Sequence, residues 1–247
     1  MAKSSDNGAP TVADRLADVR ERIRLACERC GRDPRDVTLI GASKRQPIER
    51  LRAAAEAGLR TFGENQVQEA EVKVPVLPVD LDWHFIGTLQ SNKAKPAVRI
   101  FSTVHSLDRP KIARVLAEEA GRQNRRLKGF IQVHLGDEPT KHGFPEDGEA
   151  LVRAVRPLAG LERLEVVGLM ALPPYEDDPV AQRAWFRKLA ELRDLLADEA
   201  EWRGFPGLLS MGMSDDFEIA VEEGATHVRV GSSLFGPRLD QPIRRAA

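Results

Sequence analysis

The sequence has few of the residues that characterise several classes of protein. Its 247 residues include 2 cysteines, 1 tyrosine and 3 tryptophans. Cys27 and Cys30 form a lone C-x-x-C pair, too few ligands for a structural zinc site, and they fall late in a segment with a helical pattern. We therefore assign them packing roles and expect no metal site. The scarcity of aromatic residues disfavours a surface on which nucleic-acid bases stack.

The sequence also lacks an excess of one charge and a long hydrophobic run. Its net charge is −1, from 37 basic and 38 acidic residues, so no overall field attracts nucleic acid or a membrane surface. No apolar run approaches the ~20 residues of a membrane span, and the residues after Met1 have no signal-peptide core. We expect a cytoplasmic protein whose partners are neither nucleic acids nor membranes.

What the sequence does contain is a regular alternation of strand-like and helix-like segments. Short apolar runs lie at 37–42, 60–62, 83–87, 103–106, 129–135, 165–170, 208–211 and 227–230. Helical patterns lie between them at 48–57, 64–74, 91–97, 109–122, 146–157, 179–201 and 215–223. Strands that alternate with helices indicate a parallel sheet, and eight such units in about 250 residues favour a closed barrel. The prediction is an α/β protein with a single (β/α)₈ TIM barrel.

A further helix is expected before the first strand. Apolar residues from Val12 to Ala26 recur every three or four positions, and Gly31 ends the pattern. This amphipathic helix is additional to a plain barrel. No linker or change of composition marks a second domain, so we expect one domain over 11–238, with flexible tails at 1–10 and 239–247.

The first predicted strand leads directly to a lysine, Lys44. In parallel α/β proteins, functional residues gather at the carboxyl ends of the strands. A lysine shielded from water there can become the neutral amine that attacks an aldehyde. An exposed lysine just past a strand is the other interpretation, because most lysines lie on the surface.

Two loops rich in glycine and serine follow the seventh and eighth predicted strands. Ser210, Gly212 and Ser214 belong to the first loop, and Gly231 and Ser232 to the second. TIM barrels often bind phosphate at these two loops, through backbone N–H groups at helix starts. Two ordinary helix caps would explain the same residues, and the sequence leaves both interpretations open.

Arg229 lies within the eighth predicted strand. Val228 and Val230 flank it and share the face opposite to its own, but the sequence does not say which face is interior. An interior arginine could hydrogen-bond a ring nitrogen, whereas an outward one would pair with a covering helix. A lysine, a phosphate site and an arginine facing a ring together suggest pyridoxal phosphate (PLP).

Several motifs make the chain resemble the pyridoxal phosphate homeostasis protein family, whose fold is similar to the N-terminal barrel of alanine racemase. The resemblance covers residues 12 to 238. It rests on Ser43-Lys44, Phe62–Asn65, Val67–Glu69, Trp83–Gly87, Leu89–Lys93, Leu169–Pro174, Leu209–Gly231 and Phe235-Gly236. Four residues depart from the family pattern: Thr88 replaces a histidine, Gln66 an aromatic residue, and Arg45-Gln46 the frequent Thr-Lys.

The resemblance implies a role for each candidate residue. Lys44 would carry PLP covalently as an internal aldimine, with Arg229 facing the pyridine nitrogen. The residues implied around the phosphate are Ser210, Gly212, Ser214, Gly231 and Ser232. Those implied near the ring are Asn65, Ile86 and Met170.

The implied function is intracellular PLP homeostasis by a monomeric carrier that has no strong catalytic activity and could pass PLP to apo-enzymes. The alternative is a PLP-dependent amino-acid racemase, which needs a second acid–base group opposite the lysine. In alanine racemases this is a tyrosine from an added domain, whereas Tyr175 here has the context of a packed loop residue. A third hypothesis, an aldolase using Lys44 on a sugar phosphate, predicts a colourless protein.

Overall fold

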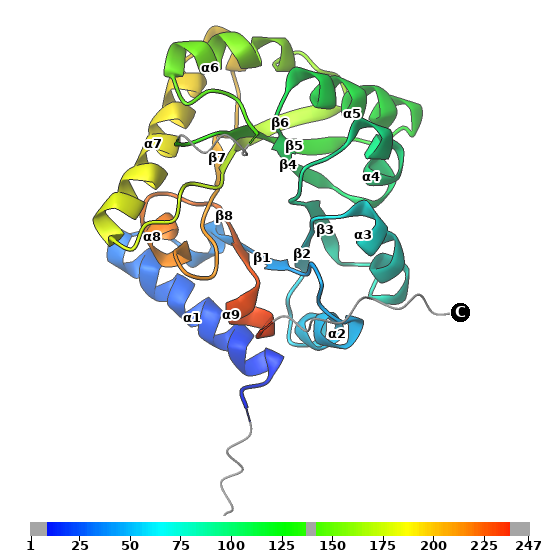
Figure 1. Ribbon diagram of the computed structural model, residues 1–247, viewed down its shortest axis with the longest axis vertical. Helices are drawn as coiled ribbons and strands as arrows, with labels where there is room; N and C mark the ends of the chain where they lie inside the picture. Colours follow the sequence, from blue (N-terminus) through cyan, green and yellow to red (C-terminus); the bar gives the residue numbers. More distant parts are fainter. Residues whose placement is uncertain (1–8, 137–141, 238–247) are drawn as a thin grey trace, which may run out of the picture.

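Eight parallel strands close into a barrel in the order β1 to β8 (Figure 1). The computed structural model describes residues 9–136 and 142–237; most of both expected tails lies outside the described residues. The strands are β1 (Thr38–Ala42), β2 (Thr61–Glu64), β3 (Asp82–Phe85), β4 (Thr103–Leu107), β5 (Leu127–Val133), β6 (Leu164–Ala171), β7 (Leu208–Ser210) and β8 (His227–Val230). The predicted TIM barrel is confirmed.

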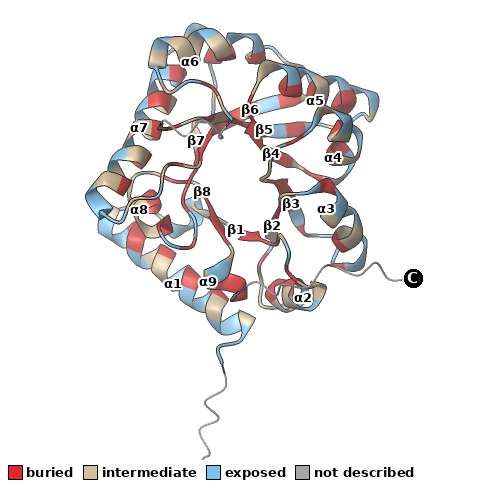
Figure 2. Ribbon diagram, in the orientation of Figure 1, coloured by how far each residue is buried: buried red, intermediate tan, exposed pale blue. Residues whose placement is uncertain are grey.

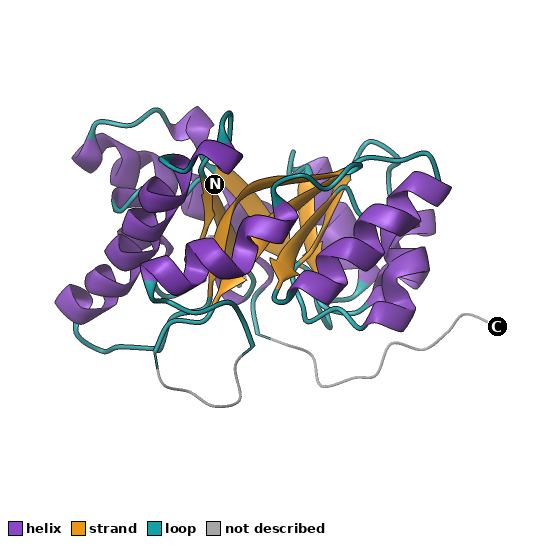
Figure 3. Cartoon of the chain, turned by 90° about the horizontal axis from the view of Figure 1, so that it is seen from above, coloured by secondary structure: helices purple, strands orange, loops and turns teal. Residues whose placement is uncertain are grey.

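Helices follow the strands and surround the barrel, as Figure 3 shows from a second direction. They are α2 (Ile48–Glu56), α3 (Val67–Lys73), α4 (Ala94–Ile100), α5 (Pro110–Arg122), α6 (Gly148–Val155), α7 (Pro179–Ala197), α8 (Phe217–Glu222) and α9 (Ser232–Phe235). Helix α3 begins later than the predicted residue 64, because Glu64 still pairs with Phe85 in the sheet. The short α9 was not predicted, since four residues are too few to display a helical period.

The predicted additional helix is α1 (Val12–Cys30), which lies along the outside of α8 and α9 (Figure 1). Thr11 and Asp14 form a reciprocal capping box at its start, and Gly31 ends it with a left-handed φ of 70°. Its buried face includes Cys27. Arg22 fastens it to α8 through a two-bond contact with Glu218, at 2.8 and 3.0 Å.

Two apolar layers hold the barrel together. The larger lies between the strands and the surrounding helices, and the smaller lies inside the barrel, where Phe130, Val167 and Met170 pack together. Figure 2 shows the strands buried along most of their length, with the buried faces of the helices turned toward them. Because both faces of a parallel strand are buried here, a sequence pattern alone cannot tell the interior face from the helix-covered face.

Candidate cofactor-binding site

Lys44 lies in a turn directly after β1, at the carboxyl mouth of the barrel, and is half-buried. A Cβ placed at Gly41 would meet Leu59 at 2.6 Å and Leu234 at 3.2 Å, so position 41 faces the surrounding helices. Alternation along the strand then turns Ala42 to the interior. The turn is anchored by the backbone N–H of Ser43, which donates to the Gly63 carbonyl of β2 at 2.9 Å.

The loop after β8 lies beside the end of β1. Gly41 is paired with Val230 in the sheet, and a Cβ at Gly231 would lie 3.5 Å from the Ala42 Cβ. That is an ordinary contact distance, so the protein itself has room for a side chain at position 231. Glycine therefore leaves space next to the lysine turn, which is the arrangement expected where a ligand approaches the backbone.

The loops after β7 and β8 are tied to each other through Ser214. Its Oγ accepts the backbone N–H of Gly231 at 3.2 Å and that of Ser233 at 3.4 Å, and the Ser233 hydroxyl donates to the Ser214 carbonyl. Gly212 has φ +90°, and a Cβ there would lie 2.6 Å from the Ala220 Cβ, so a larger residue is excluded. Ser232 begins α9 and is exposed.

Asn65, at the carboxyl end of β2, has a polar atom without a partner. Its side-chain Oδ1 is buried and accepts no hydrogen bond in the described structure. Its backbone packs so tightly against Gly87 that a Cβ at position 87 would lie 2.3 Å from the Asn65 carbonyl oxygen. Ile86 lies just before this contact, and its side chain would meet a Cβ placed at Gly63. A buried amide oxygen without a partner is costly, and a bound polar ligand would satisfy it.

Arg229 faces the barrel interior. The flanking Val228 and Val230 belong to the outer apolar layer, whereas the Arg229 guanidinium is buried and donates to Ser210 Oγ at 2.6 Å and to the Ala171 carbonyl at 3.0 Å. The outward salt bridge that the sequence left open is therefore absent from these contacts. Burial lowers the pKa of Arg229 to about 10, with Asp216 opposing the shift, so the guanidinium stays charged at neutral pH.

A chain of hydrogen bonds runs through the interior from Arg229 to Asp82, at the start of β3. Ser210 Oγ lies 2.8 Å from His105 Nδ1, His105 Nε2 lies 2.9 Å from His84 Nδ1, and His84 Nε2 lies 3.0 Å from Asp82 Oδ2. An ionised carboxylate only accepts, so His84 donates to Asp82 through its Nε2. His84, which is buried in β3, is a link in this chain.

The pKa values of His105, His227 and Asp82 are all shifted downward. Burial, reinforced by the neighbouring charges, holds the pKa of His105 well below its usual range and lowers the pKa of His227 to about 3. Burial would raise the pKa of Asp82, but hydrogen bonds from His84 and Ser102 outweigh it and bring the value to about 2. His105 and His227 are therefore neutral and Asp82 is charged at neutral pH.

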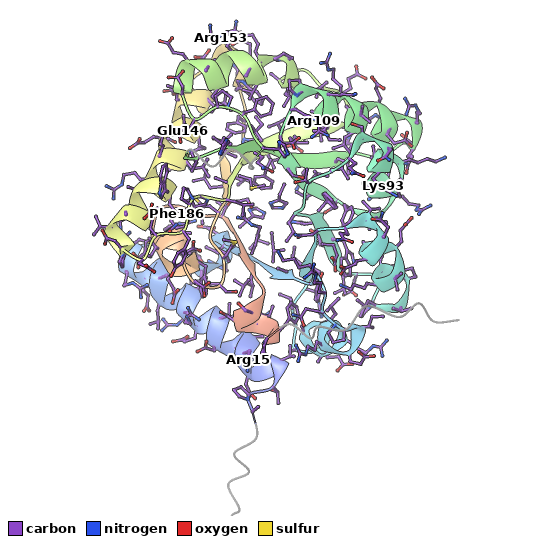
Figure 4. All side chains as sticks on the ribbon, in the orientation of Figure 1. Arg15, Lys93, Arg109, Glu146, Arg153 and Phe186 are labelled. Carbon is purple, nitrogen blue, oxygen red and sulfur yellow. The ribbon has the colours of Figure 1, made fainter. Side chains whose placement is uncertain are left out.

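The other candidate residues are distributed around the same mouth. Met170, near the end of β6, belongs to the interior cluster with Phe130 and Val167. Thr88 and Gln66, two of the departures from the family pattern, line a cavity of about 320 Å³ together with Asn65. Lys93, labelled in Figure 4, is on the rim of that cavity beside α4. Tyr175 is 73% exposed.

A larger cavity, of about 600 Å³, lies at the opposite, amino-terminal end of the barrel. It is lined by residues such as Arg126, Leu164 and Trp202, which precede or begin β5, β6 and β7. No predicted site residue lines it. Because the strand ends that carry Lys44, Asn65 and Gly231 meet at the other mouth, we place the candidate site there.

Sequence reasoning missed a buried group of charged residues beside Lys44, formed by Glu64, Glu69 and Lys73. Glu64 and Lys73 are fully buried, and Lys73 Nζ lies 2.5 Å from Glu64 and 2.8 Å from Glu69. The four-residue spacing of Glu69 and Lys73 was visible in the sequence, but such pairs are usually exposed on a helix surface. Nothing local indicated that this pair packs against the lysine turn.

Two classes of site find no support in the described part of the chain. Residues 9–136 and 142–237 contain no group of three or more His, Cys, Asp or Glu side chains arranged to hold a metal ion. None of the helices in those residues combines the length and the hydropathy that crossing a bilayer requires.

Comparison with known proteins places this chain in a family. Residues 16–239 match the family model of the alanine racemase N-terminal domain. The chain is 45% identical, over 228 residues, to a protein of Aquifex aeolicus named pyridoxal phosphate homeostasis protein, covering 92% of this chain and 98% of that one. A Pseudomonas aeruginosa protein of the same name is 47% identical over 232 residues, covering 92% and 96%.

Solved structures agree with this assignment. PipY of Synechococcus elongatus, solved without PLP, superposes with a TM-score of 0.81 at 38% identity, covering 92% of this chain and all of that one. The same protein solved with PLP bound gives a TM-score of 0.76. The fold and site thus define an alanine racemase N-terminal-type barrel. Within that class, the chain belongs to the pyridoxal phosphate homeostasis protein family, as its motifs implied.

Proposed function

We propose that this protein holds PLP covalently, as a Schiff base on Lys44, and acts in intracellular PLP homeostasis without strong catalytic activity of its own. The observation that carries the proposal is the pairing of Gly41 with Val230, which sets the Lys44 turn next to the open space at Gly231. A relative that is 38% identical has been solved with PLP bound. PLP carries an aldehyde, which an amine can attack, and a phosphate, which a loop can bind. The Lys44 turn and the loop at Gly231 follow adjacent strands, β1 and β8.

The described residues fit the parts of PLP. We propose that the hydroxyls of Ser214 and Ser232 and backbone N–H groups of the two loops hold the phosphate, in the manner of other TIM-barrel phosphate sites, with Gly212 and Gly231 lining the same space. The unpartnered Oδ1 of Asn65 is a candidate acceptor for the ring hydroxyl. Ile86 and Met170 would contact the ring.

Arg229 and Ser210 are proposed to act together beneath the ring. The guanidinium, which stays charged, would donate to the pyridine nitrogen and leave that nitrogen unprotonated. Ser210 Oγ already bonds to His105 and Arg229, so we propose that it serves the cofactor by orienting Arg229. A neutral pyridine withdraws electrons weakly, which favours storage of PLP over amino-acid chemistry.

The test is to trap the bond between PLP and the protein. The purified protein is incubated with PLP, its visible absorbance is recorded, borohydride is added, and the modified lysine is mapped by peptide mass spectrometry. We expect a single modified site, Lys44, and loss of both absorbance and modification in Lys44→Ala. Lys93→Ala, which removes another lysine of the same rim, is the matched control and should behave like the unmodified sequence.

Two outcomes would overturn the proposal. Modification spread over several lysines, or retained in Lys44→Ala, would contradict a Schiff base at Lys44. Sustained inversion of single-enantiomer amino acids at enzymatic rates would instead favour the racemase alternative, with which the alanine racemase-type fold is compatible.

We further expect a cytoplasmic monomer that passes PLP to apo-enzymes. To test the transfer, the loaded protein is mixed with a PLP-free aminotransferase, and recovery of aminotransferase activity is measured.

A further inference from the structure

The two residues that flank Lys44 are both held by the next βα unit of the barrel. On one side, the Ser43 hydroxyl donates to Glu64 Oε1 at 2.7 Å, and the Ser43 carbonyl accepts from Lys73 Nζ at 2.7 Å. On the other side, the Arg45 backbone N–H donates to Glu69 Oε2 at 2.9 Å. Lys44 therefore sits between two anchored neighbours.

Lys73 is the centre of this arrangement. Its ammonium group has three N–H donors, and the three acceptors around it are the Ser43 carbonyl, Glu64 Oε1 and Glu69 Oε2. The side chains of Lys73 and Glu64 have no exposed surface, and Glu69 keeps 14%. Taking such charges out of water is costly, and a well-packed apolar group of similar volume is often as stable. The charges therefore call for an explanation other than stability.

Glu64 also connects the lysine turn to a second part of the candidate site. Its Oε1 accepts hydrogen bonds from the Ser43 hydroxyl and from Lys73 Nζ, while its Oε2 accepts one from the backbone N–H of Asn65 at 3.3 Å. One buried carboxylate thus links the turn after β1 to the loop after β2. Burial raises the pKa of Glu64, against the opposing effect of Lys73.

The backbone of the turn has a shape that needs outside support. Arg45 has φ +56°, in the left-handed region that residues other than glycine rarely occupy, at a cost of about 1–3 kcal/mol. The group that holds Arg45 in this conformation is the Glu69 carboxylate, through the hydrogen bond to its N–H. Side chains of α3 thereby fix the backbone on which Lys44 is carried.

We propose that Glu64, Glu69 and Lys73 are positioning residues that hold the Ser43–Arg45 turn in the conformation in which Lys44 reacts with an aldehyde. This inference rests on the proposed function of Lys44. The role proposed for these three charged side chains is to orient the Lys44 amine; they do not contact the cofactor. Misplacement of a reacting group by about 1 Å can slow a reaction about 100-fold, so a loosened turn should be measurable in the rate of attachment.

The decisive comparison is between two substitutions of one residue. Glu69→Ala removes the acceptor for Arg45 and leaves the Lys73–Glu64 pair electrically neutral. Glu69→Gln removes the charge but keeps an oxygen that can accept the Arg45 N–H. Glu71→Ala is the matched control, because Glu71 lies on the same helix and pairs with Arg99 on the exposed surface. Far-ultraviolet circular dichroism and urea midpoints establish that each variant folds.

Three readouts separate positioning from general damage. In the protein without ligand, hydrogen exchange at the Arg45 amide should speed up in Glu69→Ala and stay slow in Glu69→Gln. The rate of borohydride-trapped attachment of PLP to Lys44 should fall about 10- to 100-fold in Glu69→Ala and be largely restored in Glu69→Gln. Affinity for pyridoxine 5′-phosphate, which lacks the aldehyde, should change less than about twofold, because it needs the phosphate loops and not the amine.

Two outcomes would contradict the inference. An unchanged attachment rate in Glu69→Ala, or an equal loss of affinity for both ligands, would show that these charges do not position Lys44. If Glu69→Ala does not fold, Ser43→Ala removes one hydroxyl, which contacts Glu64 Oε1 and the Gly63 carbonyl, and should still slow attachment about threefold with pyridoxine 5′-phosphate binding intact. Failure of the unsubstituted protein to attach PLP at all would instead overturn the proposed function.

Discussion

Arg229 donates a hydrogen bond to Ser210 Oγ in the centre of the barrel, and this one contact joins the mouth of the barrel to its base. Ser210 in turn bonds to His105, His105 bonds to His84, and His84 bonds to Asp82, where the chain of hydrogen bonds ends. Ser210 Oγ accepts from Arg229 Nη1 and also bonds to His105 Nδ1, so the serine is fixed on both sides. The guanidinium is consequently held in one orientation beneath the space where a ring nitrogen is proposed.

The first prediction concerns the free energy of unfolding of two buried serines. Ser210→Ala leaves the Arg229 Nη1 and the His105 Nδ1 without partners, so we expect a loss of about 2 kcal/mol. Ser106 is equally buried, but its hydroxyl has no hydrogen-bond partner in the described structure. Ser106→Ala should therefore change stability by less than about 0.5 kcal/mol or raise it. Urea unfolding of both variants measures the difference, and equal losses would contradict the chain.

The second prediction concerns the pH dependence of stability. Burial lowers the pKa of His227 to about 3, whereas an unfolded histidine titrates near about 6.5. Below that value the unfolded chain binds a proton that the folded chain does not, so the contribution of His227 is complete above about pH 6.5 and is lost as the pH falls. From about pH 7.5 to about pH 5.5, this one histidine should cost the folded state about 1 kcal/mol.

His227→Gln isolates that contribution, because Gln keeps a polar group for the Thr226 hydroxyl but does not titrate. The pH-dependent loss of stability should be smaller in the variant than in the unsubstituted protein by the contribution of one histidine. Glu64 and Asp216 have raised pKa values, so they act in the opposite direction at lower pH, and the difference between the two proteins removes them. Parallel pH profiles for the two proteins would show that His227 is charged when folded.

The third prediction concerns the attachment of α1. Arg22 makes two hydrogen bonds to Glu218 and lies 4.5 Å from the Phe217 ring centroid, so it contacts α8 through charge and through packing. Arg22→Ala should cost about 1 kcal/mol of unfolding free energy. Arg24 pairs within its own helix and is more exposed, so Arg24→Ala should cost less than Arg22→Ala. Thermal unfolding of the two variants tests the ranking, and the opposite order would be inconsistent with the interface.

Much of the fold could be predicted because its signals are local. The alternation of apolar runs with helical patterns located all eight strands, and Gly31 marked the end of α1. The same kind of signal placed Lys44 at a strand end. The face of Arg229 could not be predicted, because both faces of β8 are buried, and valines on either side are compatible with either orientation.

The polar contacts within the site depend on residues that are far apart in the chain. Ser210 and His105 are 105 positions apart, and Lys73 reaches a carbonyl 30 positions away. Each of these residues has an ordinary interpretation on its own: a helix cap, a core histidine and a surface helix pair. Only the closure of the barrel brings them together, so their roles follow from topology and not from local pattern.

The last prediction concerns two glycines: Gly231, which we expect ligand binding to require, and Gly212, which we expect the fold to require. Gly231 has φ −115°, and an added Cβ would make only ordinary contacts, so Gly231→Ala should change the unfolding free energy by less than about 0.5 kcal/mol. The same methyl group would occupy the space proposed for the phosphate and should weaken PLP binding about tenfold or more. Gly212→Ala, at φ +90° and 2.6 Å from Ala220, should instead destabilise the fold by about 2 kcal/mol. Urea unfolding and PLP titration of both variants measure the two effects; a Gly231→Ala protein that binds PLP with unchanged affinity would place the phosphate elsewhere.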